Sequence, residues 1–400
     1  MAKKTAADIL DKDLKGKKVF VRCDFNVPLD DKQNISSDKR IKASIPTIEF
    51  LNKKGAILIL ASHLGRPKGE VKREMSLAPV QKRLSELLNK EVKMVSDCIG
   101  PEVKTAVSGL KEGDILLLEN LRFHKAETKN DPEFAKELSS LADIYVSDAF
   151  GTVHRAHAST EGIAHLLPAY AGFLIEKELK FLGDALTEPK RPFVAIIGGA
   201  KISGKLQVLK SLLKQVDTLI VGGGMAYTFF KARGIDIGKS ICEDDLIPEA
   251  KEILKAAIDE EVPFLLPIDH VVADDFSENA NVQIVPRTTI PGGWQGMDIG
   301  PDTVKKFKNA LKDAGTIVWN GPMGVFEMDE FAKGTLEVAK AVAKATENGA
   351  VSIIGGGDSA SAVKKAGLAD KMSHISTGGG ASLEFLEGKV LPGIAILQEK

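Results

Sequence analysis

The stretch from Ala350 to Lys364 constrains the fold more than any other, because it joins a short apolar run, three consecutive glycines and a helical pattern. The largely β-branched run Val351–Ile354 is typical of a buried strand. Gly355–Gly357 allow a tight turn and a close approach of the backbone to a ligand. Asp358 and Ser359 favour the first turn of a helix. A strand, a glycine turn and a helix N-terminus predict an anion site, since free N–H groups and the helix dipole both favour negative charge.

Glycine turns also end three further apolar runs, all in the second half of the chain. They follow residues 196–197, 220–221 and 375–376. Residues 355–360 match the loose glycine spacing of dinucleotide-binding folds, but residues 373–381 lack the acidic residue that this fingerprint expects about 20 positions later. Since several strands present such turns, we expect the turns to meet at one edge of a parallel sheet.

Strands of the first half end instead in arginine and histidine. The strand patterns at residues 19–21, 56–61, 115–118 and 144–146 each run into such side chains. Together with Arg40, at the start of a predicted helix, the residues concerned are Arg22, His63, Arg66, Arg122, Arg155 and His157. Ligands of parallel α/β sheets bind beyond the carboxyl ends of the strands, so this set predicts a trap for a small, highly charged anion.

Simpler structural explanations exist for each of these arginines and histidines. Each arginine taken alone is equally well a solvated surface charge, so the prediction depends on the whole set. His63 and His157 can bind anions, donate to the backbone or simply occupy the loop. Zinc is not favoured there, because no cysteine pair and no H-x-x-x-H pattern accompanies them.

The second half offers further candidate contacts. Residues 199–205 fit the first seven positions of a P-loop, but Leu206 stands where serine or threonine must reach Mg²⁺, which argues against a true P-loop. Lys201 and Lys205 remain at a predicted helix start, where they either face a phosphate chain or are solvated. Residues 262–269 predict a strand and 292–298 a flexible loop. The loop 320–327 offers apolar surface for a flat base and Glu327 as an acceptor for ribose hydroxyls, although both can be local packing.

Composition limits the class of protein. Four hundred residues predict two domains, and 44% hydrophobic with 27% charged residues is typical of a soluble globular protein. A net charge of −1 gives no electrostatic reason to expect nucleic acid or membrane as a partner. The opening residues lack the apolar core of a signal peptide, so we expect a cytoplasmic protein. Cys23, Cys98 and Cys242 show no C-x-x-C spacing and favour ordinary reduced thiols, with a small chance that Cys23 is reactive.

An amphipathic helical pattern at residues 174–182 predicts a connecting helix between two halves. The expected fold class is α/β, with two doubly wound, Rossmann-like parallel-sheet domains joined by this helix and a hinge. We expect an N-terminal domain at residues 1–170 and a C-terminal domain at residues 171–387 that begins with the helix. The tail 388–400 is too short for a domain and is expected to dock on the first.

One cation-lined half and one half with glycine turns suit a two-substrate phosphoryl transferase, because such transfer consists mostly of positioning and charge neutralisation away from water. A hinged solute-binding protein is a second possibility, but it needs an export signal. A nicotinamide dehydrogenase is a third, which the missing acidic residue argues against.

The chain resembles the phosphoglycerate kinase family over essentially its whole length. Nine motifs carry the resemblance: RCDFNVPL, SHLGRP, LENLRF, DAFGTVHRAHAS, GGAKISGKL, GGGMAYTF, WNGPMGVFE, GGGDSAS and STGGGASLE. The resemblance implies reversible, Mg²⁺-dependent phosphoryl transfer between 1,3-bisphosphoglycerate with ADP and 3-phosphoglycerate with ATP (EC 2.7.2.3), in glycolysis and gluconeogenesis. It also implies domain closure, a monomer, and small molecules as the only partners.

The resemblance further implies the site residues. A triose-phosphate site in the N-terminal domain is formed by Asp24, Phe25, Asn26, Arg40, His63, Leu64, Gly65, Arg66, Arg122 and Arg155. A nucleotide site in the C-terminal domain is formed by Lys201, Lys205, Gly223, Gly224, Gly296, Pro322, Val325, Glu327, Gly355, Gly356, Gly357, Asp358 and Ser359. Asp358 is the implied Mg²⁺ ligand. Arg40 and Lys201, with N–H groups near Gly356 and Gly379, are implied to stabilise the transferred group without a general base.

Overall fold

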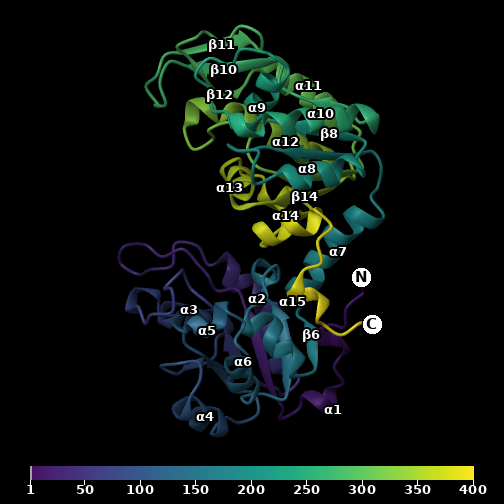
Figure 1. Cartoon of the computed structure of the whole chain (residues 1–400). Helices are drawn as coiled ribbons and strands as arrows, with labels where there is room; N and C mark the ends of the chain where they lie inside the picture. Colours follow the sequence, from purple (N-terminus) through teal and green to yellow (C-terminus); the bar gives the residue numbers. More distant parts are fainter. Residues whose placement is uncertain (1) are drawn as a thin grey trace. The chain divides into compact units, whose positions relative to one another are not determined.

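The computed structural model describes residues 2–400, which form two compact units. The first unit runs to Lys180 and also includes Val390–Lys400, and the second is Phe181–Lys389. The division falls inside helix α7 (Phe173–Thr187), the helix that the pattern at residues 174–182 predicts. Figure 1 follows the chain from the purple N-terminus to the yellow C-terminal segment. The roles expected for the two domains stay predictions.

The first unit is built on a six-stranded sheet in which every pairing is parallel. The strand order is β3-β4-β2-β1-β5-β6. The strands are β1 (Lys18–Cys23), β2 (Ile57–Ala61), β3 (Lys93–Met94), β4 (Ile115–Leu117), β5 (Ile144–Asp148) and β6 (Ala169–Ala171). The strands expected at residues 19–21, 56–61, 115–118 and 144–146 are thereby confirmed.

Helices of the first unit cover this sheet, and the C-terminal segment joins them. They are α1 (Asp11–Leu14), α2 (Lys39–Lys53), α3 (Ala78–Leu88), α4 (Pro101–Ser108), α5 (Lys125–Thr128), α6 (Pro132–Ser139) and α15 (Pro392–Ala395). The buried Lys3 side chain donates from Nζ to the carbonyls of Ala395 (3.1 Å) and Leu397 (2.8 Å). The last residues therefore complete the first unit, and Figure 1 shows both chain ends beside β6.

The second unit contains a second parallel six-stranded sheet, in the order β15-β14-β13-β7-β8-β9. Its strands are β7 (Phe193–Ile197), β8 (Thr218–Val221), β9 (Phe264–Leu265), β13 (Thr316–Asn320), β14 (Val351–Gly355) and β15 (His374–Ile375). Strands β7 and β13 are adjacent although a long stretch of chain separates them. This reversal of strand order is a topological switch point, where doubly wound sheets open a crevice at their carboxyl ends.

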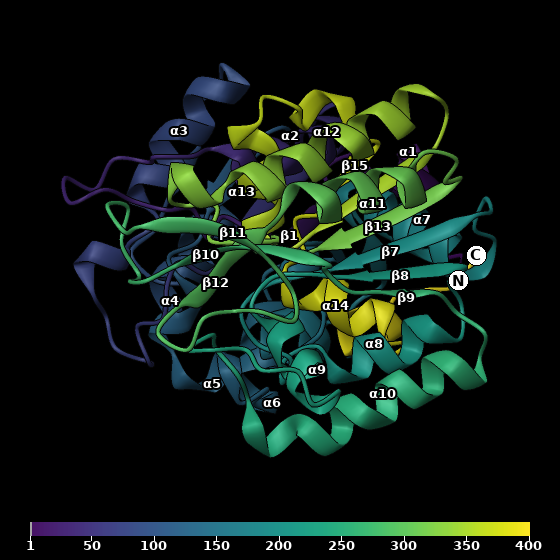
Figure 2. The ribbon, with the colours of Figure 1, turned by 90° about the horizontal axis from the view of Figure 1, so that it is seen from above.

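Helices lie on both faces of this second sheet. They are α8 (Leu206–Leu213), α9 (Met225–Ala232), α10 (Ile247–Asp259), α11 (Pro301–Leu311), α12 (Lys333–Glu347), α13 (Gly357–Lys365) and α14 (Gly380–Leu386). Figure 2 shows α11, α12 and α13 on one side of the strands and α8, α9, α10 and α14 on the other. The expected α/β class with two doubly wound sheets is confirmed.

Three expectations about the second unit were wrong. The single strand expected at residues 262–269 is only β9, because Pro267 interrupts the run and the chain enters β10 (Asp269–Ala273) of another sheet. The flexible loop expected at residues 292–298 instead enters β12 (Gln295–Ile299). With β11 (Val282–Pro286), these strands form an antiparallel sheet in the order β11-β10-β12. The helix expected at Lys201 begins only at Leu206, so Lys201 lies in the preceding loop.

The central strands of both sheets are buried on both faces. All five residues of β2, of β5 and of β7 are buried, as expected for central parallel strands covered by helices. Within residues 2–400, none of the helices has the length and apolar composition that a membrane crossing requires.

Candidate active site

Arg40 is held in place by the loop that follows β1. Its Nη1 donates to Asp24 Oδ1 and to the carbonyl of Asn26, both at 3.1 Å. The Asp24 side chain is buried, whereas that of Arg40 remains 36% exposed. The cation at the start of α2, unfavourable against the helix dipole by itself, is thus stabilised by a buried carboxylate. An anion that reaches Arg40 meets a guanidinium already fixed in direction.

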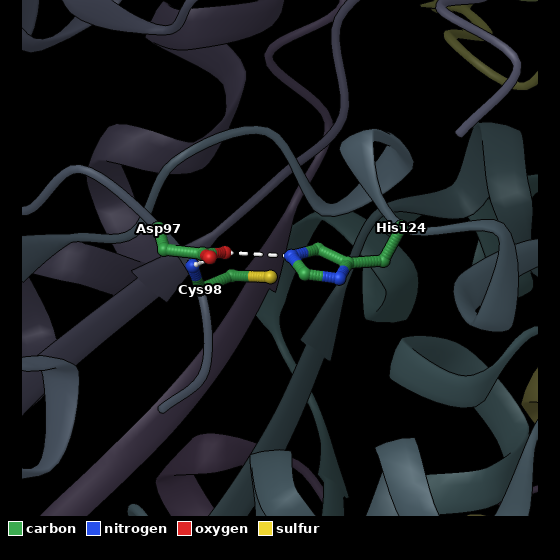
Figure 3. A group of neighbouring side chains, drawn as sticks. All are labelled: Asp97, Cys98 and His124. Carbon is green, nitrogen blue, oxygen red and sulfur yellow. Dashed lines mark hydrogen bonds and ion pairs between the residues drawn. The ribbon is translucent and has the colours of Figure 1, made fainter. Parts of the chain in front are cut away.

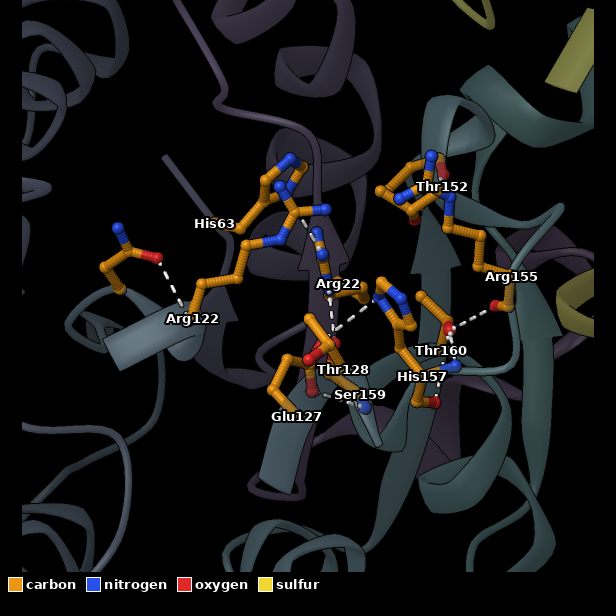
Figure 4. A network of polar contacts seen from close by, with 12 residues as sticks. Arg22, His63, Arg122, Glu127, Thr128, Thr152, Arg155, His157, Ser159 and Thr160 are labelled. Carbon is orange, nitrogen blue, oxygen red and sulfur yellow. Dashed lines mark hydrogen bonds and ion pairs between the residues drawn. The ribbon is translucent and has the colours of Figure 1, made fainter. Parts of the chain in front are cut away.

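A buried chain of polar groups lies behind this loop (Figure 4). Arg22, fully buried, donates from Nε to Ser159 Oγ (2.8 Å) and from Nη1 to the carbonyl of Cys23. Its Nη2 lies 3.2 Å from His63 Nδ1. Ser159 in turn donates from its backbone N and its Oγ to the buried carboxylate of Glu127. The prediction that Arg22 belongs to the anion trap is wrong, because its donors are used inside the fold.

Both histidines of the predicted trap are uncharged at neutral pH. Burial, followed by the nearby cations Arg22, Arg122 and Arg40, holds the pKa of His63 well below its usual range. Burial and the same kind of neighbours lower the pKa of His157 to about 4. Since arginine only donates, His63 Nδ1 accepts from Arg22, and the proton of the neutral ring then sits on Nε2. His63 can therefore serve as a hydrogen-bond donor but not as a cation.

Asn120 organises the neighbouring loops, a role that sequence reasoning missed. Its side chain donates to the carbonyl of Leu64 (2.8 Å) and accepts from the backbone N–H groups of Leu64 and Arg122. Arg122 donates from Nη1 to the carbonyl of Gly65 (2.9 Å), and the N–H of Gly65 donates to Asn26 Oδ1 (2.8 Å). The sequence signal was available, since an asparagine before a short helical turn is a common cap.

A cationic cavity of about 460 Å³ lies in the first unit. Three of the predicted arginines, Arg66, Arg122 and Arg155, line it together with His157. It is also lined by residues that were not predicted: Lys68, Gly69, His124, Lys125, Thr128 and Lys129. Asp24, Phe25, Asn26, Arg40, His63, Leu64 and Gly65 do not line it. The hydrogen bonds of Asn26 and Asn120 connect the two groups of residues. Burial lowers the pKa of Arg122 to about 10, which leaves it charged at neutral pH.

A larger cavity of about 570 Å³ lies at the switch point of the second unit. Seven of the predicted nucleotide contacts line it: Gly223, Gly224, Gly296, Pro322, Val325, Glu327 and Asp358. The glycine turns also pack against one another. A Cβ on Gly223, whose φ is +69°, would lie 2.6 Å from the backbone N of Gly199. Glycine is therefore required here by the fold itself as well as by any ligand.

One wall of this cavity comes from the antiparallel sheet and α9, and Gly296 is the one residue of this wall that was predicted. Tyr227 Oη lies 3.2 Å from Nδ1 of the buried His270. A Cβ on Gly296 would come within 1.6 Å of Tyr227 Oη, so this predicted contact is a glycine because a tyrosine packs on it. Burial raises the pKa of Asp298, another wall residue, to about 7. These residues lie inside strands and a helix, where pattern reasoning predicts only core.

The remaining predicted residues lie outside this cavity, around the N-terminus of α13. Gly356 (φ +85°) is its N-cap, and Gly357, Asp358 and Ser359 form its first turn. The buried Ser359 Oγ accepts from the N–H of Gly321 (2.6 Å), which ties this first turn to the loop after β13. Gly355 ends β14, and Gly379 (φ +53°) is the N-cap of α14.

Two lysines flank this region in different ways. Lys205 is half-buried and donates from Nζ to the side-chain and main-chain oxygens of Asn320. Burial lowers its pKa to about 8, against the opposing effect of Asp358. Lys201 is exposed, and its loop is fixed by Glu243, whose carboxylate accepts from the N–H groups of Ile202 (2.6 Å) and Ser203 (3.0 Å). Both lysines are suitable for binding a polyphosphate. Lys201 is accessible from solvent, and Lys205 is already held in position by Asn320.

The three cysteines are free thiols in this structure. Cys23 is fully buried, and burial together with the neighbouring Asp148 raises its pKa well above the usual range. A thiolate is the reactive form of cysteine, so the reactivity considered for Cys23 is not supported.

A doubly wound pair of units, one with a cationic cavity and one with a glycine-lined cavity beside a helix N-terminus, defines a phosphotransferase with two substrates. Comparison with known proteins specifies the family. The family model described as phosphoglycerate kinase matches residues 9–389, and the chain belongs to the phosphoglycerate kinase family. It is accordingly an enzyme of the type EC 2.7.2.3, a kinase of glycolysis.

Individual relatives and solved structures support the same family assignment. The chain is 59% identical over 400 residues to the chloroplastic phosphoglycerate kinase 2 of Arabidopsis thaliana, covering 100% of this chain and 84% of the relative. It is 58% identical to the cytosolic phosphoglycerate kinase of Triticum aestivum, covering 99% of each. The phosphoglycerate kinase structure from Coxiella burnetii superposes with a TM-score of 0.89 at 43% identity, and that from Pyrococcus horikoshii OT3 with 0.84 at 35%, each covering 98% of both chains.

The neutral His157 predicts a pH-dependent stability. With a folded-state pKa of about 4 and an unfolded-state value of about 6.5, the unfolded chain binds the proton more readily between these values. The stabilising contribution is therefore complete above pH 6.5 and is lost as the pH falls toward 4. Urea unfolding at pH 7 and pH 5 should show a smaller pH effect for His157→Gln than for the wild type.

A matched control is His165→Gln, which removes a histidine whose side chain is 54% exposed. It should not reduce the pH effect, because that imidazole is already in contact with water. An equal reduction in both variants would contradict the role of burial at His157.

Proposed function

We propose that this chain transfers a phosphoryl group reversibly between 1,3-bisphosphoglycerate with ADP and 3-phosphoglycerate with ATP, with the acidic triose held in the first unit and the nucleotide in the second. The observation that supports this assignment is that the two units carry different kinds of anion-binding groups. Arginines and neutral histidines line the sites of one unit, and glycine turns with a helix N-terminus line the other. Arginine forks suit phosphate and carboxylate oxygens, and free N–H groups suit a polyphosphate.

The triose site is proposed to combine the cationic cavity with the fixed loop beside it. Arg66, Arg122 and Arg155 offer donors to a phosphate. Asp24, Asn26, Arg40 and His63 offer donors and acceptors of fixed direction for the carboxylate and hydroxyl end. The His63 ring, neutral with its proton on Nε2, donates one hydrogen bond without adding a charge.

The nucleotide site is proposed to use the 570 Å³ cavity for the base and ribose. Val325 and Pro322 give it apolar surface, and Glu327 offers an acceptor for the ribose hydroxyls. The phosphates extend from there toward the first turn of α13 and Lys205. Asp358 is exposed at the cavity wall in that first turn, an arrangement that suits a hard cation held by carboxylate and phosphate oxygens. Bound Mg²⁺ would supply neutralisation of phosphate charge, and Asp358 would hold it directly or through water.

Catalysis is proposed to rest on charge neutralisation without a general base. In the ATP-consuming direction the acceptor is a carboxylate with a pKa of about 3.5, which is ionised at neutral pH. No residue needs to remove a proton. Arg40 from one unit and Lys201 from the other are proposed to stabilise the moving group, with N–H groups near Gly356 and Gly379 contributing further donors.

The test of the whole proposal is a coupled assay. Purified protein, 3-phosphoglycerate and Mg·ATP are combined, and 1,3-bisphosphoglycerate is followed through a reducing coupling enzyme. We expect activity that requires both substrates and Mg²⁺. A folded protein that binds both ligands but does not turn over would contradict the catalytic roles of Arg40 and Lys201.

The transition-state role predicts a specific kinetic pattern for single substitutions. Arg40→Ala and Lys201→Ala should each lower kcat by roughly 100- to 1,000-fold, as removal of one oxyanion donor does elsewhere, with smaller changes in KM. Lys39→Ala is the matched control, since Lys39 is an exposed cation next to Arg40 on the same helix. A normal kcat with only a raised KM in either variant would show that the residue binds substrate uniformly instead.

The lowered pKa of Lys205 leads us to expect proton uptake when a nucleotide binds. Its pKa of about 8 leaves part of the population uncharged at pH 8.5, and a bound polyphosphate restores the charge. Calorimetry of Mg·ADP binding at that pH, in buffers of different ionisation enthalpy, should detect a fraction of a proton taken up. Lys205→Arg stays charged and should bind without uptake, whereas uptake equal to the wild type in this variant would contradict the assignment.

Closure of the two units is proposed to bring the ligands together, since each is assigned to a different unit. The doubly liganded protein should then have a smaller radius of gyration by X-ray scattering than the ligand-free protein. Either ligand alone serves as the control. An unchanged radius with both ligands bound would count against closure.

We also propose a cytoplasmic location and a monomeric state. The family resemblance supports the monomer, and curated relatives include proteins named cytosolic and chloroplastic. Cell fractionation and sedimentation test these two points directly.

A further inference from the structure

Asp97, Cys98 and His124 form a cluster of metal-ligating side chains in the first unit (Figure 3). One ligand atom of each residue lies within 4.8 Å of those of the other two. In the part of the chain that the structure describes, it is the one group of three or more such side chains that meets this distance. The proposed reaction assigns no chemical step to any of the three, although His124 lines the cavity proposed for the triose, and the proposed Mg²⁺ ligand Asp358 lies in the other unit.

The fold brings the three residues together from two segments of the chain. Asp97 and Cys98 follow β3, and His124 follows the short turn after β4. These two strands pair in parallel, so their following loops leave the same edge of the sheet. The N–H of Glu119 donates to the carbonyl of Asp97 (3.3 Å) and joins the two loops. The side chains therefore meet through the sheet register and not through one flexible loop.

The distances are close to those of a four-coordinate zinc site. Such a site has bonds of about 2.0–2.3 Å, which place its ligand atoms roughly 3.5 Å apart. Here His124 Nε2 lies 2.6 Å from Asp97 Oδ1, in a hydrogen bond that an ion would replace. To hold an ion between them, the His124 and Asp97 ligand atoms need to separate by about 1 Å. The His124 and Asp97 side chains are 30% and 47% exposed, which leaves a path for the ion and room for water as the fourth ligand.

The charges of the three groups also match a divalent cation. A carboxylate and a thiolate supply two negative charges, and a neutral imidazole adds none, so the complex with a divalent ion has no net charge. Burial and the neighbouring Asp97 raise the pKa of the Cys98 thiol well above its usual range, so the thiol keeps its proton until the bound ion displaces that proton to water. Neutrality is important because His124 also lines the cationic cavity with Arg122 and Lys125. An uncompensated cation would be repelled there.

We propose that Asp97, Cys98 and His124 bind one thiophilic divalent cation of the zinc class, with water in the fourth position. The sulfur ligand determines the class, because thiolate and imidazole favour zinc and cobalt over magnesium. The simpler alternative is an Asp97–His124 ion pair beside an unrelated buried thiol. The two interpretations differ in whether sulfur ever bonds to the metal.

Cobalt(II) is the probe that separates them, because a thiolate–cobalt bond gives a near-ultraviolet charge-transfer absorption. Titration of the full-length, metal-free protein with Co²⁺ should give this absorption, saturating at one ion per chain. Zn²⁺ should abolish it by competition, and excess Mg²⁺ should not. Cys98→Ser should remove the absorption and weaken Co²⁺ binding by ~100-fold or more, since even indirect partners of metal ligands contribute 10- to 100-fold.

Cys242→Ser is the matched control, because Cys242 is the more accessible thiol and also lies beside a carboxylate, with Sγ 3.3 Å from Asp244 Oδ1. It should keep the charge-transfer absorption. Absence of the absorption in the wild type, its persistence in Cys98→Ser, or its loss in Cys242→Ser would each overturn the proposal. Asp97→Asn gives a second test if Cys98→Ser does not fold. It should keep the absorption with weakened affinity, and unchanged affinity would remove Asp97 from the site.

Discussion

Parallel strand pairing is the constraint on which both proposed sites depend, because it makes every loop after a strand leave from the same edge of its sheet. In the first unit, β1 pairs with β2 and β5, and the loops after them carry Asp24, His63 and the residues around Phe150. In the second unit, β7 pairs with β13, and the glycine turns after these strands pack directly on each other. The sheets thus collect polar groups from distant parts of the sequence at one edge. The chemistry differs between the units because the residues after the strands differ.

The fully buried guanidinium of Arg22 influences the charge state of its neighbours in the first unit. Removing a guanidinium from water costs several kcal/mol unless it is paired and hydrogen-bonded, and Arg22 has Ser159, the Cys23 carbonyl and His63 as partners, with Glu127 behind Ser159. Burial, together with this positive charge, keeps His63 neutral, and the contact with Arg22 fixes its tautomer. The result is a site in which arginines and lysines supply the cations and His157 is held neutral.

Much of this arrangement could be predicted from the sequence. Apolar runs bounded by glycine or arginine predicted the strands. Because the loops after parallel strands leave one edge of the sheet, the residues that follow these runs were predicted to converge there. The fate of each side chain depends on burial, which a pattern does not contain. Arg22 looked like Arg66 until packing buried it, and the burial of the Ser359 hydroxyl against the N–H of Gly321 is likewise absent from the pattern. Tyr227 and His270 gave no signal, since inside regular elements they resemble ordinary core. The antiparallel sheet was missed because Pro267 and the glycines at residues 292–293 are typical of a loop.

The docking of Val390–Lys400 on the first unit has a consequence for the order in which the chain folds. The second unit is one continuous segment and has all its residues once Lys389 has been synthesised. The first unit does not, because Lys3 finds its carbonyl partners only at Ala395 and Leu397. During synthesis the first unit therefore still lacks Val390–Lys400 when all residues of the second unit have been made. The part of the protein made first is the last to be completed.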